Sequence, residues 1–211
     1  MKPMDYKKIE KQYYKPKEKP EIINIPTMRF IYVDGFGNPG DPQGEYVDAI
    51  SAIYTIAYTI KMNLKKQNDI KGYHDYVVFP LEGLWEIKDY KGYDISLKDQ
   101  FIWKAMMRVP DFVTKEVFET YKMLASKKKN KDFSKVKYMT FEEGLVVQML
   151  HIGSYDQEIQ SVKLMNAYIK EEGYIEDFGQ SRKHHEIYLS DPRKTKADKL
   201  KTIIRHPIKK L

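Results

Sequence analysis

LKTIIRHP, residues 200–207, repeats a segment from the first half of the chain, WKAMMRVP at 103–110. The two segments align without a gap and match Lys104 with Lys201, Arg108 with Arg205 and Pro110 with Pro207. Around each copy the apolar pattern gives the same order, which is a strand pair, a glycine, a helix and two strands. This order predicts two related strand-helix-strand-strand modules, at about 21–110 and about 136–208.

The expected fold follows from the short connections and from the single helix in each half. Both features favour an α+β fold whose strands join into one antiparallel or mixed sheet. The helices would cover one face of this sheet. A central ligand pocket would then lie on the opposite face or at the seam between the modules.

Local patterns predict the individual elements. Strand pairs are expected at 21–35, around Pro26, and at 136–153, joined at Glu142 to Gly144. Apolar residues at helical spacing predict a helix at about 45–66, and the capping pattern of Ser154 with Gln157 opens a second one that stops at Gly173. The other expected elements are extended segments at 75–87, 101–110 and 199–207, a connection at 88–100 and a short helix after Thr114.

Composition places the chain among globular proteins. Of its 211 residues 42% are hydrophobic and 32% are charged, which is enough for a substantial core and a solvated surface. Residues 1–20 are expected to form an N-terminal arm on a single domain at 21–211, with Tyr13 and Tyr14 holding it down. The absence of cysteine, of an apolar leader and of any membrane-length apolar run predicts a soluble, cytoplasmic protein.

The net charge of +7 raises the question of an acidic partner. The excess is scattered and is partly concentrated at Lys127, Lys128, Lys129 and Lys131, which suggests a solvated loop. We therefore expect neither direct nucleic-acid binding nor membrane binding. Either a monomer or a homodimer is compatible with the sequence.

KHHEIYLSDP, at 183–192, holds the main candidate for chemistry. In a strand His184, Glu186 and Tyr188 point to one face, because side chains alternate. A carboxylate between an imidazole and a phenol is either part of a half-exposed sheet surface or the floor of a ligand pocket. His185 and Ile187 are expected to face the helices instead.

Several other kinds of site are not predicted. His184 and His185 are adjacent on a strand and point to opposite faces, so they cannot share a metal ion. GFGNPG at 35–40 lacks the lysine and hydroxyl residue of a phosphate-binding loop, and the chain has no GxSxG sequence. We expect no metal and no cofactor.

The chain resembles the GyrI-like small-molecule-binding proteins from about residue 20 to residue 208. The resemblance is carried by PEIINIP at 20–26, RFIYVDGFGNPGD at 29–41, PLEGLWEI at 80–87, PDF at 110–112, EEGLVVQMLHIGSYD at 142–156 and KHHEIYLSDPRKTKADKLKTIIRHPI at 183–208. It implies paired modules around a pocket for bulky aromatic or cationic compounds. Some members are effector domains of drug-efflux regulators, but too few residues precede the first strand here for a DNA-binding helix-turn-helix.

A subfamily similar to this chain hydrolyses the cyclopropane of cyclopropanoid DNA-alkylating compounds within an aromatic cage. The resemblance implies that Glu186, in the family's glutamate strand, and Tyr188 are the catalytic candidates. Candidates for contact with a flat ligand are Trp85, Trp103, Phe112 and His184, although Trp103 on its apolar strand is equally typical of a core residue. Glu82 is a second possible carboxylate or a residue of the turn before Gly83.

Three functions remain open at this point. The first is a xenobiotic-binding hydrolase that protects the cell from strained electrophiles. The second is a protein that sequesters flat aromatic or cationic compounds without catalysis. The third is an interaction protein that modulates a nucleic-acid enzyme.

Overall fold

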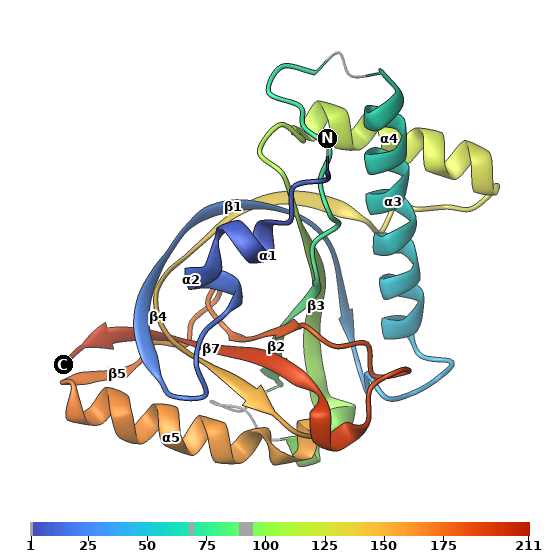
Figure 1. Ribbon diagram of the computed structural model, residues 1–211. Coiled ribbons are helices and arrows are strands. Elements are labelled where there is room, and N and C mark those ends of the chain that lie inside the picture. Colours follow the sequence, from blue (N-terminus) through green and yellow to red (C-terminus); the bar gives the residue numbers. More distant parts are fainter. Residues whose placement is uncertain (1, 68–69, 89–94) are drawn as a thin grey trace.

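A computed structural model describes residues 2–67, 70–88 and 95–211 (Figure 1). Its long helices are α3 (Glu45–Gln67), α4 (Lys115–Lys129) and α5 (Glu158–Glu171). The strands are β1 (Glu21–Phe36), β2 (Leu81–Ile87), β3 (Phe101–Val109), β4 (Lys137–Ile152), β5 (Tyr174–Glu176), β6 (His184–Tyr188) and β7 (Lys201–Lys210). Short helical segments are α1 (Tyr6–Ile9), α2 (Lys11–Tyr14) and the 3-10 turns η1 (Ile95–Gln100), η2 (Tyr155–Gln157) and η3 (Ala197–Lys199). The expected α+β class is confirmed.

The sheet closes on itself, which the sequence did not predict. The strands follow the order β4-β1-β3-β2-β6-β7, and β7 pairs with β4 to complete an antiparallel barrel of six strands. β5 adds to the outer edge of β7. An open sheet with one covered face is therefore replaced by a barrel that has an inner and an outer face.

β1 and β4 are each one long curved strand rather than the two strands expected. β1 pairs with β4 from Glu21 to Tyr32, and the pairing skips only Pro26, which has no backbone N–H to donate. Met28 packs inside the barrel, whereas Ile22 packs outside against α5, so the alternation of faces shifts at Pro26. Gly144, which lies beside it on β4, has φ +69°, a conformation that side chains rarely adopt. The shift bends both strands and helps the sheet to close.

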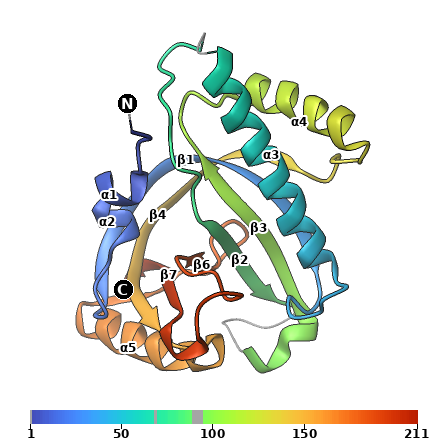
Figure 2. The same cartoon turned by 45° about the vertical axis from the view of Figure 1, so that its right-hand side comes forward.

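The long helices cover the outside of the barrel (Figures 1 and 2). α3 buries an apolar stripe against β1 and β3, and α4 packs on α3. α5 lies over β4 and β7. The buried aliphatic residues of α3 are Ala49, Ile53, Ile56, Ala57, Ile60 and Leu64, and those of α5 are Val162, Met165 and Ile169. Burial of each large aliphatic side chain contributes about 1.5–3 kcal/mol.

The N-terminal arm is bonded to the barrel. Arg108 on β3 forms a two-pronged ion pair with Glu10 and a 3.2 Å hydrogen bond to the hydroxyl of Tyr14. The carbonyl of Tyr13 accepts a 2.6 Å bond from Arg205 of β7. Tyr14 is buried, and so this segment packs as part of the core.

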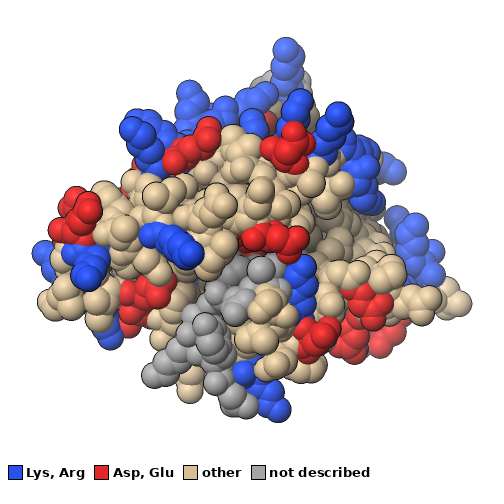
Figure 3. All heavy atoms as spheres, turned by 90° about the horizontal axis from the view of Figure 1, so that it is seen from below, with Lys and Arg blue, Asp and Glu red and all other residues tan. Residues whose placement is uncertain are grey.

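Charged groups of both signs are interspersed on the face seen in Figure 3. Lys127, Lys128 and Lys129 form the last turn of α4 rather than a loop, where cations favour the helix dipole. Among the described residues no helix has the length and apolar character to cross a membrane.

Candidate functional site

Glu186 lies on the outer face of β6, at the seam between α3 and α5. In the row of paired residues across the barrel, Gly83 is its neighbour on β2 and Ile204 its neighbour on β7. Ala105 follows on β3, below α3, and Met149 follows on β4, below α5. The Glu186 residue is only 3% exposed. Its neighbours in this row include two small residues, Gly83 and Ala105.

The prediction that His185 and Ile187 face the helices is wrong. His185 points into the barrel, where its ring bonds Glu143 at 2.9 Å and Glu82 at 3.0 Å. The alternation along β6 is as expected, but His184, His185, Glu186 and Ile187 are all buried. No contrast between polar and apolar residues marks the inner face, so the sequence could not distinguish the two sides.

A second buried carboxyl group lies next to Glu186. Glu158, in the first turn of α5, has no exposed surface, and its carboxyl oxygen comes within 4.8 Å of ligand atoms of Glu186 and His184. Burial raises the pKa of Glu158 well above its usual value, and the charge of Glu186 raises it further. Burial and the second carboxyl group beside it thus both favour the protonated form of Glu158. Both oxygens of Glu158 are buried, and the adjacent Glu186 carboxyl group is the group that interacts with them.

Aromatic side chains surround this carboxyl pair. The indole N–H of Trp85 donates to the hydroxyl of Tyr188 at 3.1 Å. Tyr155 meets Tyr188 edge-on, with ring centroids 5.9 Å apart, and Tyr46 from the start of α3 lies 5.3 Å from Trp85. Burial, and then the charge of Glu186, raise the pKa of Tyr188 well above its usual value. Tyr188 thus remains a neutral phenol that can donate a proton.

Gly83 is required for the position of Trp85. A Cβ atom on Gly83 would lie 2.7 Å from the indole nitrogen and 3.0 Å from the adjacent ring carbon. The indole therefore folds across Gly83 toward Tyr188. This contact explains why the LEGLW segment has a glycine at position 83.

His184 links Glu186 to a line of further groups. Its Nε2 lies 3.0 Å from Glu186 Oε1, and its Nδ1 lies 2.7 Å from Nε2 of His206. Burial lowers the pKa of His184 to about 4, against the opposing effect of Glu186. The imidazole is consequently neutral at physiological pH and holds the Glu186 carboxyl group in one orientation.

The predicted site residues are only partly brought together. Glu186, Tyr188, Trp85 and His184 are adjacent, as the contacts above describe. Trp103 is 2% exposed and packs edge-on against Tyr46 at 5.0 Å, one ring away from the carboxyl pair.

Phe112 lies elsewhere, among the rings of Tyr73, His74 and Tyr76. Glu82 is neither a turn residue nor a neighbour of Glu186, because it is buried on the inner face of β2. These two side chains do not contribute to the aromatic surroundings of Glu186.

Sequence reasoning missed Glu158, Tyr46 and Tyr155. Each lies near the start of a helical segment, where acidic and polar residues are common: Glu158 in α5, Tyr46 in α3 and Tyr155 in η2. The capping box of Ser154 and Gln157, which was predicted, places Tyr155 and Glu158 at this end of α5. This capping pattern was the feature of the sequence that could have identified Tyr155 and Glu158 as site residues.

A metal ion has a possible ligand set here in Glu158, His184 and Glu186. Both ring nitrogens of His184 already form hydrogen bonds, to Glu186 and to His206. Binding a metal through His184 would break one of these bonds. Protons shared between these side chains account for the same arrangement, and both hydrogen bonds of His184 are then kept.

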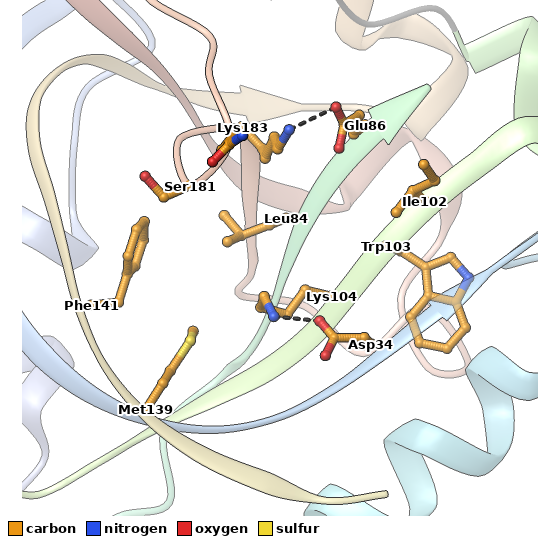
Figure 4. Close-up of a pocket in the computed structure, with 11 residues that line it drawn as sticks. Asp34, Leu84, Glu86, Ile102, Trp103, Lys104, Met139, Phe141, Ser181 and Lys183 are labelled. Atoms are coloured by element: carbon orange, nitrogen blue, oxygen red, sulfur yellow. Dashed lines mark hydrogen bonds and ion pairs between the residues drawn. The ribbon is translucent and has the colours of Figure 1, made fainter. Parts of the chain in front are cut away.

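A cavity of about 370 Å³ lies on the inner face of the barrel and does not include Glu186 (Figure 4). Leu84, Met139 and Phe141 form part of its apolar wall. Its charged groups are paired with one another, Lys104 with Asp34 and Lys183 with Glu86. The cavity therefore lies on the face of the sheet that the long helices do not cover, which is one of the two expected places for a pocket, whereas Glu186 lies at the seam on the other face.

Comparisons with known proteins agree with this fold. An uncharacterised conserved protein from Listeria innocua is 47% identical, with a TM-score of 0.90 over 98% of this chain and 100% of its own. A hydrolase from Listeria innocua is 46% identical, with a TM-score of 0.87 over 98% of this chain and 100% of its own. The C-terminal domain of EcmrR shares the fold at 13% identity, with a TM-score of 0.51 over 92% of this chain and 98% of its own.

A search of curated proteins found no match. The family model of the GyrI-like small molecule binding domain matches residues 18–209, which is nearly the whole chain. The match includes both strands that carry the site, β2 with Trp85 and β6 with Glu186. The chain therefore belongs to the GyrI-like small molecule binding domain family.

Proposed function

We propose that this protein binds flat xenobiotic compounds at the seam between α3 and α5 and hydrolyses the strained cyclopropane of cyclopropanoid DNA-alkylating toxins. One observation carries the proposal: the carboxyl groups of Glu158 and Glu186 lie side by side in a buried, aromatic environment, where the pKa of Glu158 is raised. Of two carboxyl groups that lie side by side, one can serve as the acid and the other as the base in one reaction. The 46% identical hydrolase from Listeria innocua supports hydrolytic chemistry.

The reaction requires one water molecule and no cofactor. Glu186 takes a proton from water as the water oxygen bonds to a ring carbon of the cyclopropane, and the ring carbon–carbon bond breaks. The electron pair of that bond moves through the conjugated dienone to its carbonyl oxygen. The phenol of Tyr188 or the carboxyl group of Glu158 gives this oxygen a proton, so atoms and charges balance.

The surrounding groups orient the reactants. Trp85 and Tyr46, whose ring centroids are 5.3 Å apart, are the aromatic side chains proposed to contact a flat substrate, and neutral His184 orients Glu186 through its 3.0 Å contact. Proton transfer by positioned groups accelerates such reactions by about 10²–10⁴-fold. A cyclopropane conjugated to a dienone is already electrophilic, and so this degree of catalysis is sufficient.

We also propose that β1-α3-β2-β3 and β4-α5-β6-β7 are related modules. β2 pairs with β6 across the boundary between them. The site would then lie where the modules meet, with Trp85 from the first and Glu186 from the second. A soluble, cytoplasmic location is part of the same proposal.

A second candidate function is sequestration of cations without catalysis. A buried carboxylate surrounded by ring faces favours a cationic aromatic ligand, with cation–π attraction of about 0.5–2 kcal/mol per ring. This candidate predicts tight binding of a cationic dye and no chemical change in it.

Mass spectrometry of the product distinguishes the two functions. The protein is incubated in H₂¹⁸O with a compound that carries a cyclopropane fused to a dienone. We expect a ring-opened product with one ¹⁸O atom, formed faster than without protein. If the product forms no faster than in the protein-free control, catalysis is refuted, and quenching of tryptophan fluorescence by the same compound would then support sequestration.

A further inference from the structure

A line of four hydrogen-bonded side chains leads from Glu186 to the protein surface. Glu186 Oε1 lies 3.0 Å from His184 Nε2, and His184 Nδ1 lies 2.7 Å from His206 Nε2. His206 Nδ1 then lies 2.7 Å from Glu176 Oε1 on β5. The Glu176 side chain is 30% exposed, whereas those of His206 and His184 are each 1% exposed. The line thus joins a buried carboxyl group to a carboxylate that water can reach.

Each of the three hydrogen bonds holds one proton. When Glu186 is protonated, its O–H donates to His184 Nε2, His184 Nδ1–H donates to His206 Nε2, and His206 Nδ1–H donates to Glu176. If each proton crosses its own bond, Glu186 becomes a carboxylate and Glu176 becomes an acid. No ring has to rotate, and both imidazoles are neutral before and after.

We infer that Glu176, His206 and His184 form a proton relay that connects Glu186 with solvent. The inference rests on the proposed function, in which Glu186 removes a proton from water. In the outward step three N–H or O–H bonds break and three form, and one proton leaves Glu186 and arrives at Glu176. Water then removes it from Glu176, which leaves Glu186 as the carboxylate that the proposed reaction requires. Both imidazoles then carry their N–H on Nε2, and each must return to the Nδ1–H form before Glu186 can send out the proton that it takes from water.

The surroundings of the line favour proton transfer over a fixed ion pair. Burial, and then the neighbouring His206, act to lower the pKa of His184, so its imidazole is not held in the charged form. The ring of Phe178 lies edge-on to His206 at 5.0 Å and covers it. Groups from other elements that face the Glu186 end are Glu158 of α5, Tyr46 of α3 and Tyr155 of η2, with Tyr188 of β6.

The inner face of the same strands shows the contrasting arrangement. Burial alone would lower the pKa of His185, but Glu143 and Glu82 overcome this effect and raise it to about 9. That imidazole is a permanent cation at neutral pH, and it bonds two carboxylates at once. A histidine of this kind fixes structure, whereas a neutral one between an imidazole and a carboxyl group can pass protons.

The first test examines the hydrogen bonds themselves and needs no substrate. In protein labelled with ¹⁵N at histidine, an N–H···N bond produces a scalar coupling between the two nitrogens that NMR detects. We expect this coupling between His184 Nδ1 and His206 Nε2 in the native protein. If both nitrogens are resolved and no coupling is found, the relay is refuted, whatever the protein does to a cyclopropane.

The second test measures ring opening by His206→Gln and Glu176→Gln. Glutamine keeps hydrogen bonding at each position but cannot pass a proton. We expect kcat to fall about tenfold or more in both variants, with KM unchanged and with a larger ratio of rates in H₂O and D₂O. His74→Gln is the matched control, because the ring of His74 bonds the hydroxyl of Tyr6 at 2.8 Å, packs against Phe112 and lies outside the line.

The two variants differ in how strongly they can disturb the fold. His206→Gln replaces a buried ring, so its thermal unfolding is measured as well. Glu176→Gln alters a partly exposed side chain, so its rate can still be interpreted if His206→Gln unfolds. A native kcat and isotope ratio in folded Glu176→Gln would overturn the relay. A native protein that opens no ring overturns the proposed function instead, and the nitrogen coupling then still decides whether the hydrogen-bonded line exists.

Discussion

Gly83→Ala is the substitution that most sharply tests how the aromatic part of the site is built. The added Cβ would lie 2.7 Å from Trp85 Nε1, 3.0 Å from Cε2 and 3.1 Å from Cζ2. These three atoms belong to one rigid ring, which Tyr46 and Phe101 hold from other sides with centroids 5.3 and 5.4 Å away. The indole must therefore shift, and its bond to Tyr188 must lengthen or break.

The expected cost combines three effects. Forcing an extra methyl group into a packed core costs about 1–3 kcal/mol. Loss of the Trp85 hydrogen bond costs about 0.5–1.5 kcal/mol. The reduced freedom of the unfolded chain with alanine offsets about 0.4–1 kcal/mol. We expect the free energy of unfolding to fall by about 0.5–4 kcal/mol in total.

Urea unfolding followed by tryptophan fluorescence measures both stability and the surroundings of the indole. Gly179→Ala is the control, because a Cβ at Gly179 meets no atom within 4 Å. Gly83→Ala should be less stable than the native protein, with an altered emission spectrum in the folded state, and Gly179→Ala should match the native protein. Native stability together with a native spectrum in Gly83→Ala would refute this account of Trp85.

Two further predictions concern the inner face and the arm. Because the pKa of His185 is raised above its unfolded value of 6.5 to about 9, its stabilising contribution is complete below pH 6.5 and is lost as the pH rises through 9. The difference in unfolding free energy between native protein and His185→Gln should therefore shrink over this range, and a constant difference would contradict the charged pairing with Glu143. Glu10→Gln should destabilise the protein by about 3 kcal/mol in thermal or urea unfolding, because Arg108 is left buried without its carboxylate. Exposed Glu18→Gln should have no effect, and equal stability of the two variants would show that the arm does not depend on this ion pair.

Local patterns in the sequence predicted most elements, but the closure of the sheet depends on distant pairing. Helical spacing placed the first long helix at about 45–66, and α3 spans Glu45–Gln67. The barrel, in contrast, forms because Gln148 of β4 pairs with Arg205 of β7. Nothing local in either strand requires that partner. The sequence pattern predicts breaks between strands at Pro26 and Gly144, whereas in the structure these residues allow two long strands to bend together.

The site shows the same limit at the level of single residues. The strand period placed His184, Glu186 and Tyr188 on one face without identifying which face the helices cover. Glu158 stands at a helix start, where a glutamate ordinarily faces water and favours the helix dipole. Its role arises only from the packing of α5 over β7, which buries it next to Glu186.

The ring-opening rate of Glu186→Gln compared with Glu86→Gln tests the central claim most directly. Glu86 lies on β2 and lines the inner cavity, whereas Glu186 lies at the outer seam, so the two variants assign the chemistry to one face or the other. Both are compared with native protein in single-turnover reactions, after circular dichroism has confirmed folding. We predict that Glu186→Gln slows ring opening by about 10²-fold or more while Glu86→Gln retains the native rate. A native rate in Glu186→Gln, or a loss confined to Glu86→Gln, would contradict the assignment of the site to Glu186.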